Sequence, residues 1–469
     1  MSRATRQSLV VLLCDQMQRQ ALGPYGGPAP TPTCDRLAAE GVVFDRFYCA
    51  TPLCIPTRPS MMNGRWPHAH GATSFGRDYQ VIERGSELLI DRLHDAGWLV
   101  AYEGIWHIRR PEGDDRTGEY AHFAEGGFPY AEHGRELEAL GRCADDQRAP
   151  VHTLTDAGVE AGQISVPVPA TWTRPADEHP DMQRAQRIAA FIRDAPADRP
   201  IAAWCSLAGP HPPLLVPEPW MGLVDPADLE PPPGLGMDLS GLPLGVREAP
   251  GALGTAGWGW ERWAPAIAAY YGYVAFVDHC QGVVLQALED SGRLDDTIVI
   301  ASTDHGEMLG SHGIYQKMVL YERAINIPLI MRIPGIEPSR RAHLTSQTDL
   351  APTVLELLAQ QPLARAQGRS MTPILQHPRA QWRDYTFSEY NGWRDGGHRM
   401  RAVIGERWKY VYHHGDSDQL FDLERDPDEL HDLMGQPRHT DLVDQLRSVM
   451  VGWMRDTGDP LLDELERPD

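Results

Sequence analysis

Short apolar runs that end in polar side chains recur along this 469-residue chain and alternate with helical segments. The run from Leu9 to Leu13 and the β-branched run from Thr297 to Ser302 predict buried strands. Strands that alternate with helices form a sheet covered on both faces. We therefore expect an α/β fold on a large, mostly parallel sheet. Further strands are predicted at 42–44, 98–102, 201–207 and 327–333, with helices at 33–41, 87–96, 180–194 and 264–291.

Two stretches break this alternation. Residues 209–260 are dense in proline and glycine, too long for a plain connector, and are either a lid over the substrate or a disordered insertion. Their tryptophans either form an aromatic wall or pack the loop. Near the end, 401–404, 408–412 and 419–421 predict short antiparallel strands, and a helix near 440–456 follows. We expect a catalytic domain over 1–380 and a small C-terminal α+β subdomain over 381–469.

The charge balance excludes some partners. Lys and Arg number 43 and Asp and Glu number 65, so the net charge is −22. A surface this acidic disfavours nucleic acid and anionic lipid as partners. The first apolar run is too short for a signal-peptide core, and no segment resembles a membrane span. The seven cysteines are an odd number without a C-x-x-C pair. We expect a cytoplasmic protein whose cysteines are mostly small buried hydrophobes.

Polar side chains follow two of the predicted strands directly. Asp15 and Gln16 come after the first strand, and Asp304 and His305 come after the strand that ends at 302. Because sites in open parallel sheets lie at the carboxyl ends of strands, we expect these side chains to meet. Two carboxylates, an amide and an imidazole can hold a divalent cation. The alternative is that Asp15 caps a turn and Asp304 caps a helix. For either residue alone capping is the better interpretation, but for the two together metal binding is.

The segment 53–65 contains a cysteine, Cys54, flanked by prolines and close to an arginine. Pro59 suits the first turn of a helix, which would place Cys54 at a helix N-terminus where partial positive charge favours an anion. Taken by itself, this arrangement is typical of a nucleophilic thiolate, as in a cysteine hydrolase.

The five residues from Cys54 to Arg58 resemble the C-x-P-x-R signature of the sulfatases, in the alkaline phosphatase superfamily. Other segments resemble that family in the same order: 25–26, 31–33, 37–44, 303–313 and 421–427. The resemblance implies an alkaline phosphatase-like α/β fold. It also implies that a separate formylglycine-generating enzyme oxidises Cys54 to formylglycine. By resemblance the metal ligands are Asp15, Gln16, Asp304, His305 and modified Cys54.

The resemblance also implies roles for other residues. Arg58 would hold the formylglycine, and Lys317 would contact the sulfuryl or phosphoryl oxygens, unless it is a solvated surface lysine. His211 would protonate the departing alkoxide, and His107 would lie near the nucleophile. The chain departs from most sulfatases at Ile105, where they carry a lysine that helps to hold sulfate. The Gln and His ligands are more similar to phosphonate monoester hydrolases and choline-sulfatase-like members, which makes Mn²⁺ a competitor to Ca²⁺.

The leading hypothesis is therefore a metal-dependent hydrolase of sulfate esters with a formylglycine nucleophile. The alternative is a phosphonate monoester or phosphodiester hydrolase with the same site. Two other classes stay open: a binding protein that has lost turnover, and a cysteine hydrolase that uses unmodified Cys54. The expected partners are a small anionic ester and the maturation enzyme, and a homo-oligomer is compatible with the composition.

Overall fold

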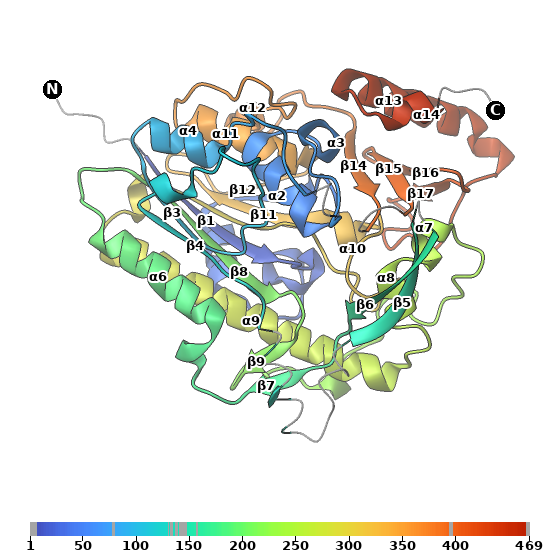
Figure 1. Cartoon of the computed structure of the whole chain (residues 1–469), viewed down its shortest axis with the longest axis horizontal. Coiled ribbons are helices and arrows are strands. Elements are labelled where there is room, and N and C mark those ends of the chain that lie inside the picture. The colour runs from blue at the N-terminus through green and yellow to red at the C-terminus, as the bar shows by residue number, and fades with distance from the viewer. Residues whose placement is uncertain are drawn as a thin grey trace.

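The computed structural model of the chain describes residues 7–76, 80–129, 131, 135–136, 139, 148–155, 158–393 and 397–465. Its largest sheet has the order β12-β2-β11-β10-β1-β8-β3-β4, with β13 paired to β2 (Figure 1). All pairings in this sheet are parallel except those of β11 with β10 and with β2, so the expected mostly parallel sheet is confirmed. The strands are β1 Ser8–Asp15, β2 Val42–Tyr48, β3 Leu99–Gly104, β4 His122–Glu125, β8 Ile201–Pro210, β10 Thr297–Thr303, β11 Asn326–Arg332, β12 Ser339–Arg341 and β13 Thr345–Ser346.

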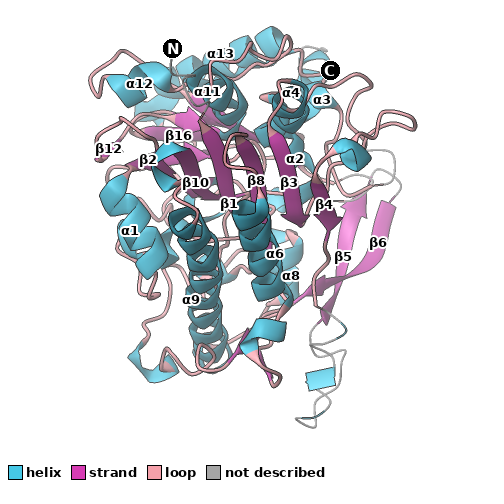
Figure 2. Cartoon of the chain, turned by 90° about the vertical axis from the view of Figure 1, so that its left-hand side faces the viewer, coloured by secondary structure: helices cyan, strands magenta, loops and turns pink. Residues whose placement is uncertain are grey.

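Helices cover both faces of this sheet, as Figure 2 shows. Strand β1 explains why both faces are apolar: Leu9, Val11 and Leu13 join one buried cluster, and the alternate residues Val10 and Leu12 join the other. The first cluster includes α2 Cys54–Asn63, α4 Leu89–Asp95 and α11 Leu350–Leu357. The second includes α1 Pro32–Glu40, α6 Pro180–Asp194 and the long α9 Trp260–Asp290. In the described part of the chain, no helix combines the length and hydropathy that a membrane crossing requires.

A separate antiparallel sheet follows near the C-terminus, in the order β14-β15-β16-β17. Its strands are β14 Thr386–Asn391, β15 Arg399–Ile404, β16 Trp408–His413 and β17 Gln419–Asp422, and α13 Thr440–Thr457 packs on it. Three of these strands and the helix were expected. Strand β14 was not, because its polar residues, among them the fully buried Glu389, obscure the alternation. The boundary at residue 380 stays a prediction.

The insertion at 209–260 is folded in this structure, so its interpretation as disordered is wrong. It contains η7 Pro226–Asp228, α7 Leu244–Arg247 and α8 Pro250–Gly254. Its tryptophans pack the loop: Trp220 lies against Phe276 of α9 with ring centroids 4.9 Å apart, and Trp258 lies against Trp263 at 5.4 Å. The backbone carbonyl of Pro233 accepts a hydrogen bond from His312 at 3.0 Å, so the insertion braces the loop after β10.

The remaining elements are short. They are the pair β5 Arg148–Thr155 and β6 Gly158–Ser165, the pair β7 Ala170–Trp172 and β9 Leu215–Pro217, and helices α3 Pro67–His70, α10 Glu322–Ile325, α12 Thr372–Gln376 and α14 Leu461–Leu465.

Candidate active site

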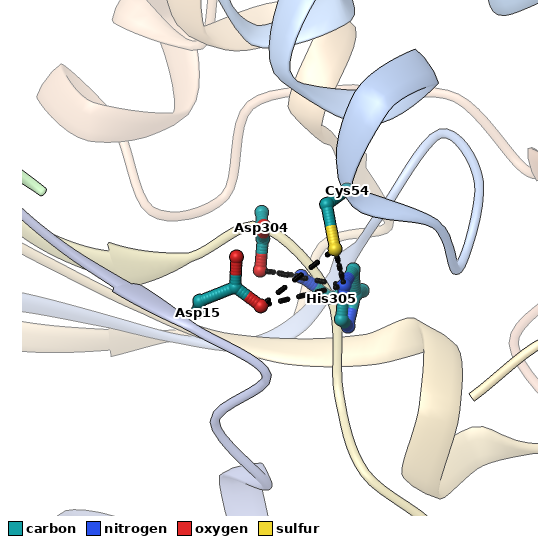
Figure 3. Close-up of side chains that lie close together, drawn as sticks. All are labelled: Asp15, Cys54, Asp304 and His305. Atoms are coloured by element: carbon teal, nitrogen blue, oxygen red, sulfur yellow. Dashed lines mark hydrogen bonds and ion pairs between the residues drawn. The ribbon is translucent and has the colours of Figure 1, made fainter. Parts of the chain in front are cut away.

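Three chain segments bring four predicted ligands together. Asp15 ends β1, and Asp304 and His305 directly follow β10, which is the parallel neighbour of β1. Cys54 is the first residue of α2, which begins above this sheet edge. One ligand atom from each of the four side chains lies within 4.8 Å of all the others. Figure 3 shows that these side chains point toward one another. The expected meeting of Asp15 with Asp304 at the carboxyl edge of the sheet is therefore observed.

The four side chains surround a common centre. The Sγ atom of Cys54 lies 3.0 Å from Nε2 of His305 and 3.7 Å from Oδ1 of Asp15. Nε2 of His305 also lies 3.8 Å from Oδ1 of Asp15 and 3.7 Å from Oδ1 of Asp304. Nδ1 of His305 lies 3.1 Å from the carbonyl oxygen of Gly306. A proton on Nδ1 donated to that carbonyl leaves the lone pair of Nε2 directed at the centre.

Arg58 compensates the charge of the two carboxylates. Its Nη2 lies 2.9 Å from Oδ2 of Asp15 and 2.9 Å from Oδ2 of Asp304. A further hydrogen bond runs from its Nη1 to Ser206 Oγ at 3.0 Å. Arg58 is only 2% exposed, and the fork geometry of its guanidinium matches carboxylate oxygens.

The pKa shifts favour a cation at this centre. Burial and the neighbouring Asp304 carboxylate raise the pKa of Asp15 to about 8, although Arg58 and Lys317 oppose the rise. Burial lowers the pKa of His305 to about 3, so its imidazole is neutral and suited to bind a metal. Two crowded carboxylates, a neutral imidazole and nearby amide oxygen are a donor set that Mn²⁺ or Ca²⁺ fits.

Cys54 lies at the N-terminus of α2, as expected, but Pro59 lies inside that helix rather than in its first turn. Burial and the Asp15 carboxylate raise the pKa of the Cys54 thiol well above its usual value. Because His305 is also neutral, the close Cys54–His305 pair is not a thiolate–imidazolium pair. This electrostatic environment disfavours Cys54 as a thiolate nucleophile.

Gln16 and Lys317 extend the cluster. The ammonium of Lys317 donates to Oε1 of Gln16, and the backbone N–H of Gln16 donates to Oδ1 of Asp304 at 3.1 Å. Lys317 is 3% exposed, so the alternative of a solvated surface lysine is wrong. The Nε2 group of Gln16 donates to Oε2 of Glu307, which is fully buried.

The two predicted site histidines are placed differently. His211 is buried, and its Nδ1 lies 2.5 Å from the carbonyl oxygen of Pro212. Burial and the charge of Lys317 lower its pKa well below the usual value. Burial and the charge of Arg58 lower the pKa of His107 to about 3, and its Nδ1 has no partner in the described part. The ring of Phe128 connects them, with centroids 4.2 Å from His211 and 6.1 Å from His107.

Position 105 contributes its backbone to the site. The Ile105 side chain is fully buried, while its carbonyl oxygen accepts hydrogen bonds from Arg58, from Tyr102 Oη at 2.5 Å and from Ser206 Oγ at 2.9 Å. This residue therefore orients Arg58 but brings no side-chain charge to the site.

Two buried residues that join the segments of the site to one another were not predicted from the sequence. Gln347 donates through Nε2 to the backbone carbonyl of Asp304 at 2.6 Å and accepts from Thr57 through Oε1. Glu307 joins Gln16 to the loop that carries Lys317. The position of Glu307, two residues after His305, was a usable signal, whereas nothing near Gln347 in the sequence marks it.

Comparison with known proteins agrees with this geometry. The sulfatase family matches residues 7–360, and the family described as N-sulphoglucosamine sulphohydrolase, C-terminal matches 310–455. An arylsulfatase of Clostridium perfringens is 25% identical over 480 residues, which cover 95% of this chain and 94% of that protein. A choline-sulfatase of Rhizobium meliloti is 25% identical over 451 residues, 92% of this chain and 83% of that protein.

The fold is also found in solved structures. The phosphonate monoester hydrolase of Agrobacterium radiobacter superposes with a TM-score of 0.79 at 23% identity, covering 96% of each chain. This similarity shows that the two chains share the alkaline phosphatase-like fold. The family match over residues 7–360 covers more than half of the chain and establishes that it is a hydrolase that belongs to the sulfatase family.

Proposed function

We propose that this chain is a metal-dependent hydrolase of sulfate esters that uses formylglycine derived from Cys54. The observation that carries the proposal is the convergence of Asp15, Asp304 and His305 on Cys54, with two buried cations beside them. In a protein with a net charge of −22, Arg58 and Lys317 provide the local positive charge that an anionic ester needs.

Asp15, Gln16, Asp304, His305 and modified Cys54 would hold the metal, which would lower the pKa of a hydroxyl enough to ionise it at neutral pH. Formylglycine at position 54, once hydrated, would supply two hydroxyls. One would serve for attack on sulfur or phosphorus with departure of the alcohol. Loss of the proton from the other would regenerate the aldehyde as the C–O bond to the inorganic group breaks. This second function is the chemical reason for converting a cysteine, because a serine side chain has only one hydroxyl. A separate formylglycine-generating enzyme would perform the conversion.

The chain's own residues supply binding, orientation and proton transfer. Arg58 bridges both carboxylates and fixes their orientation, and Lys317 would stabilise charge on the transferred group. His211 is neutral without substrate, since burial and Lys317 lower its pKa. A bound anion next to it would raise that pKa, so His211 would gain its proton as the substrate binds and donate it to the departing alkoxide.

A phosphonate monoester or phosphodiester hydrolase is the second candidate. It is favoured by Ile105, which places a buried aliphatic side chain where most sulfatases are expected to carry a lysine. With one cation fewer, the site suits a substrate of lower charge. The similarity to the hydrolase of Agrobacterium radiobacter supports the same candidate through its fold alone.

The deciding experiment starts with peptide mass spectrometry across Cys54, on protein produced with and without a formylglycine-generating enzyme. The aldehyde-containing protein is then loaded with Ca²⁺ or Mn²⁺ and assayed on aryl sulfates, phosphonate monoesters and phosphodiesters. We expect turnover that depends on both the aldehyde and the metal, with Cys54→Ala as the inactive control. If the protein is confirmed to contain the aldehyde and the metal but turns over none of the three substrate classes, the proposal is contradicted.

A further inference from the structure

Glu307 is a fully buried carboxyl group that contacts N–H donors on both oxygens. Its Oε1 accepts from the backbone N–H groups of Leu309 at 2.7 Å and Gln316 at 2.6 Å. Its Oε2 accepts from Nε2 of Gln16. Glu307 therefore ties Gln16 to both ends of the loop that precedes Lys317.

The neighbours of Gln16 fix the orientation of its amide. An ammonium can only donate, so the atom of Gln16 that faces Lys317 must be the carbonyl oxygen. The other end of the amide must then present its N–H group, and the carboxyl oxygen of Glu307 is the acceptor that it meets. A flipped amide would set Nε2 against Lys317 and Oε1 against Glu307, two unfavourable contacts at once.

We propose that Glu307 is a positioning residue that fixes the amide oxygen of Gln16 toward Lys317, and that Gln16 and Glu307 are a matched amide–carboxylate pair. An acidic residue at position 16 would place two carboxylates in direct contact inside a dry site, which is strongly unfavourable. The pair thus accounts for an amide at this position. This inference rests on the proposed function where it concerns metal binding, and on the contacts alone where it concerns the pairing.

Exchanging the two groups tests the pairing directly. In Gln16→Glu the two carboxylates repel, and in Glu307→Gln a second amide must oppose either Gln16 or the two backbone N–H groups. In the double variant, Gln at 307 keeps its oxygen on Leu309 and Gln316 and donates its amide to Glu at 16. The second oxygen of Glu at 16 still accepts from Lys317, so each hydrogen bond has a donor and an acceptor again.

The measurement is the affinity of the metal-free, full-length protein for Mn²⁺ and for Ca²⁺ by titration calorimetry. We expect each single variant to weaken binding by about 10-fold to 100-fold, and the double variant to recover to within about threefold of the wild type. A purely structural role of Glu307 predicts no such rescue of Gln16→Glu. Unchanged affinity in Glu307→Gln, or a double variant no better than the weaker single variant, overturns the proposal.

A second measurement separates this inference from the proposed function. Urea unfolding of the four metal-free proteins forms a double-mutant cycle, in which we expect the double variant to be less destabilised than the sum of the single variants. Should the wild type bind neither metal, the proposed function fails, and this cycle alone decides the pairing. Gln281→Glu is the matched control, because Gln281 is also buried but its Nε2 contacts Cys14 Sγ at 3.0 Å. The losses of unfolding free energy caused by Gln281→Glu and by Glu307→Gln should add in the protein that carries both. If the losses caused by Gln16→Glu and Glu307→Gln also simply add, the matched pair is refuted.

Discussion

Nη2 of Arg58 lies 2.9 Å from Oδ2 of Asp15, with both side chains almost completely buried. The same nitrogen lies at the same distance from Asp304, so a single guanidinium compensates the two carboxylates. Arg58 thus stabilises a site in which two carboxyl groups would otherwise lie side by side, buried and without a cation.

Removal of this guanidinium should destabilise the metal-free protein. We expect Arg58→Ala to lower the free energy of unfolding by about 3–5 kcal/mol, because it leaves buried charge without a partner. Added Mn²⁺ should recover part of that loss by supplying another cation to Asp15 and Asp304. Urea unfolding with a chelator and with Mn²⁺ measures both effects. Arg58→Lys, which keeps the charge and loses the fork, is the control, and an Arg58→Ala protein as stable as the wild type contradicts the argument.

Lys317 should act on the rate more than on substrate binding. Its buried ammonium contacts the neutral amide of Gln16, and charge that develops on the transferred group would interact with it most strongly in the transition state. We expect Lys317→Met to lower kcat by about 10²–10³-fold with a smaller change in KM. Steady-state kinetics on an aryl sulfate and an aryl phosphonate monoester measure the two constants. A rise in KM at unchanged kcat would mean that Lys317 only binds the substrate.

The role of His211 depends on the leaving group. A departing alkoxide with a high pKa needs a proton, whereas a nitrophenolate leaves without one. We expect His211→Ala to slow alkyl esters by about 10²–10⁴-fold and nitrophenyl esters far less. The measurement is kcat/KM against leaving-group pKa, which should become steeper in the variant. Parallel lines for the two proteins would exclude His211 as the general acid.

The meeting of Asp15 with Asp304 could be predicted from sequence because of a simple rule of sheet geometry. Strands β1 and β10 are parallel neighbours, so residues that follow them, such as Asp15 and Asp304, share one edge of the sheet. Glu307 and Gln347 could not be assigned in this way, because their roles arise from contacts between segments far apart in the chain. Strand β14 was missed for a related reason. Its Glu389 is buried, but a glutamate in a sequence predicts a surface position unless its partners are known.

One of those partners, His68, lies in α3, whereas Arg401 and Asp459 pair within the C-terminal part of the chain. Glu389 of β14 lies 2.5 Å from Nδ1 of His68, and Arg401 of β15 lies 2.6 Å from Asp459. Burial acts to raise the pKa of Glu389, yet His68 and Arg401 hold it below its usual value. Burial also acts to raise the pKa of Asp459, but the hydrogen bond from Arg401 holds that pKa below its usual value.

These shifts predict a loss of stability in acid. A carboxyl group whose pKa is lower in the folded state stabilises the fold fully above its unfolded pKa, which is 4.5 for Glu and 3.8 for Asp. That contribution disappears as the pH falls through the lower, folded pKa.

We expect Asp459→Asn to lower the free energy of unfolding by about 3 kcal/mol at pH 7, because Arg401 loses its hydrogen-bonded counter-charge. The difference in unfolding free energy from the wild type should narrow toward pH 3. Urea unfolding between these pH values tests this, with Glu424→Gln, at a side chain that is 69% exposed, as the control that should change little. A gap that stays constant with pH would show that Asp459 stabilises the fold by packing rather than by charge, since packing does not depend on the ionisation of this carboxyl group.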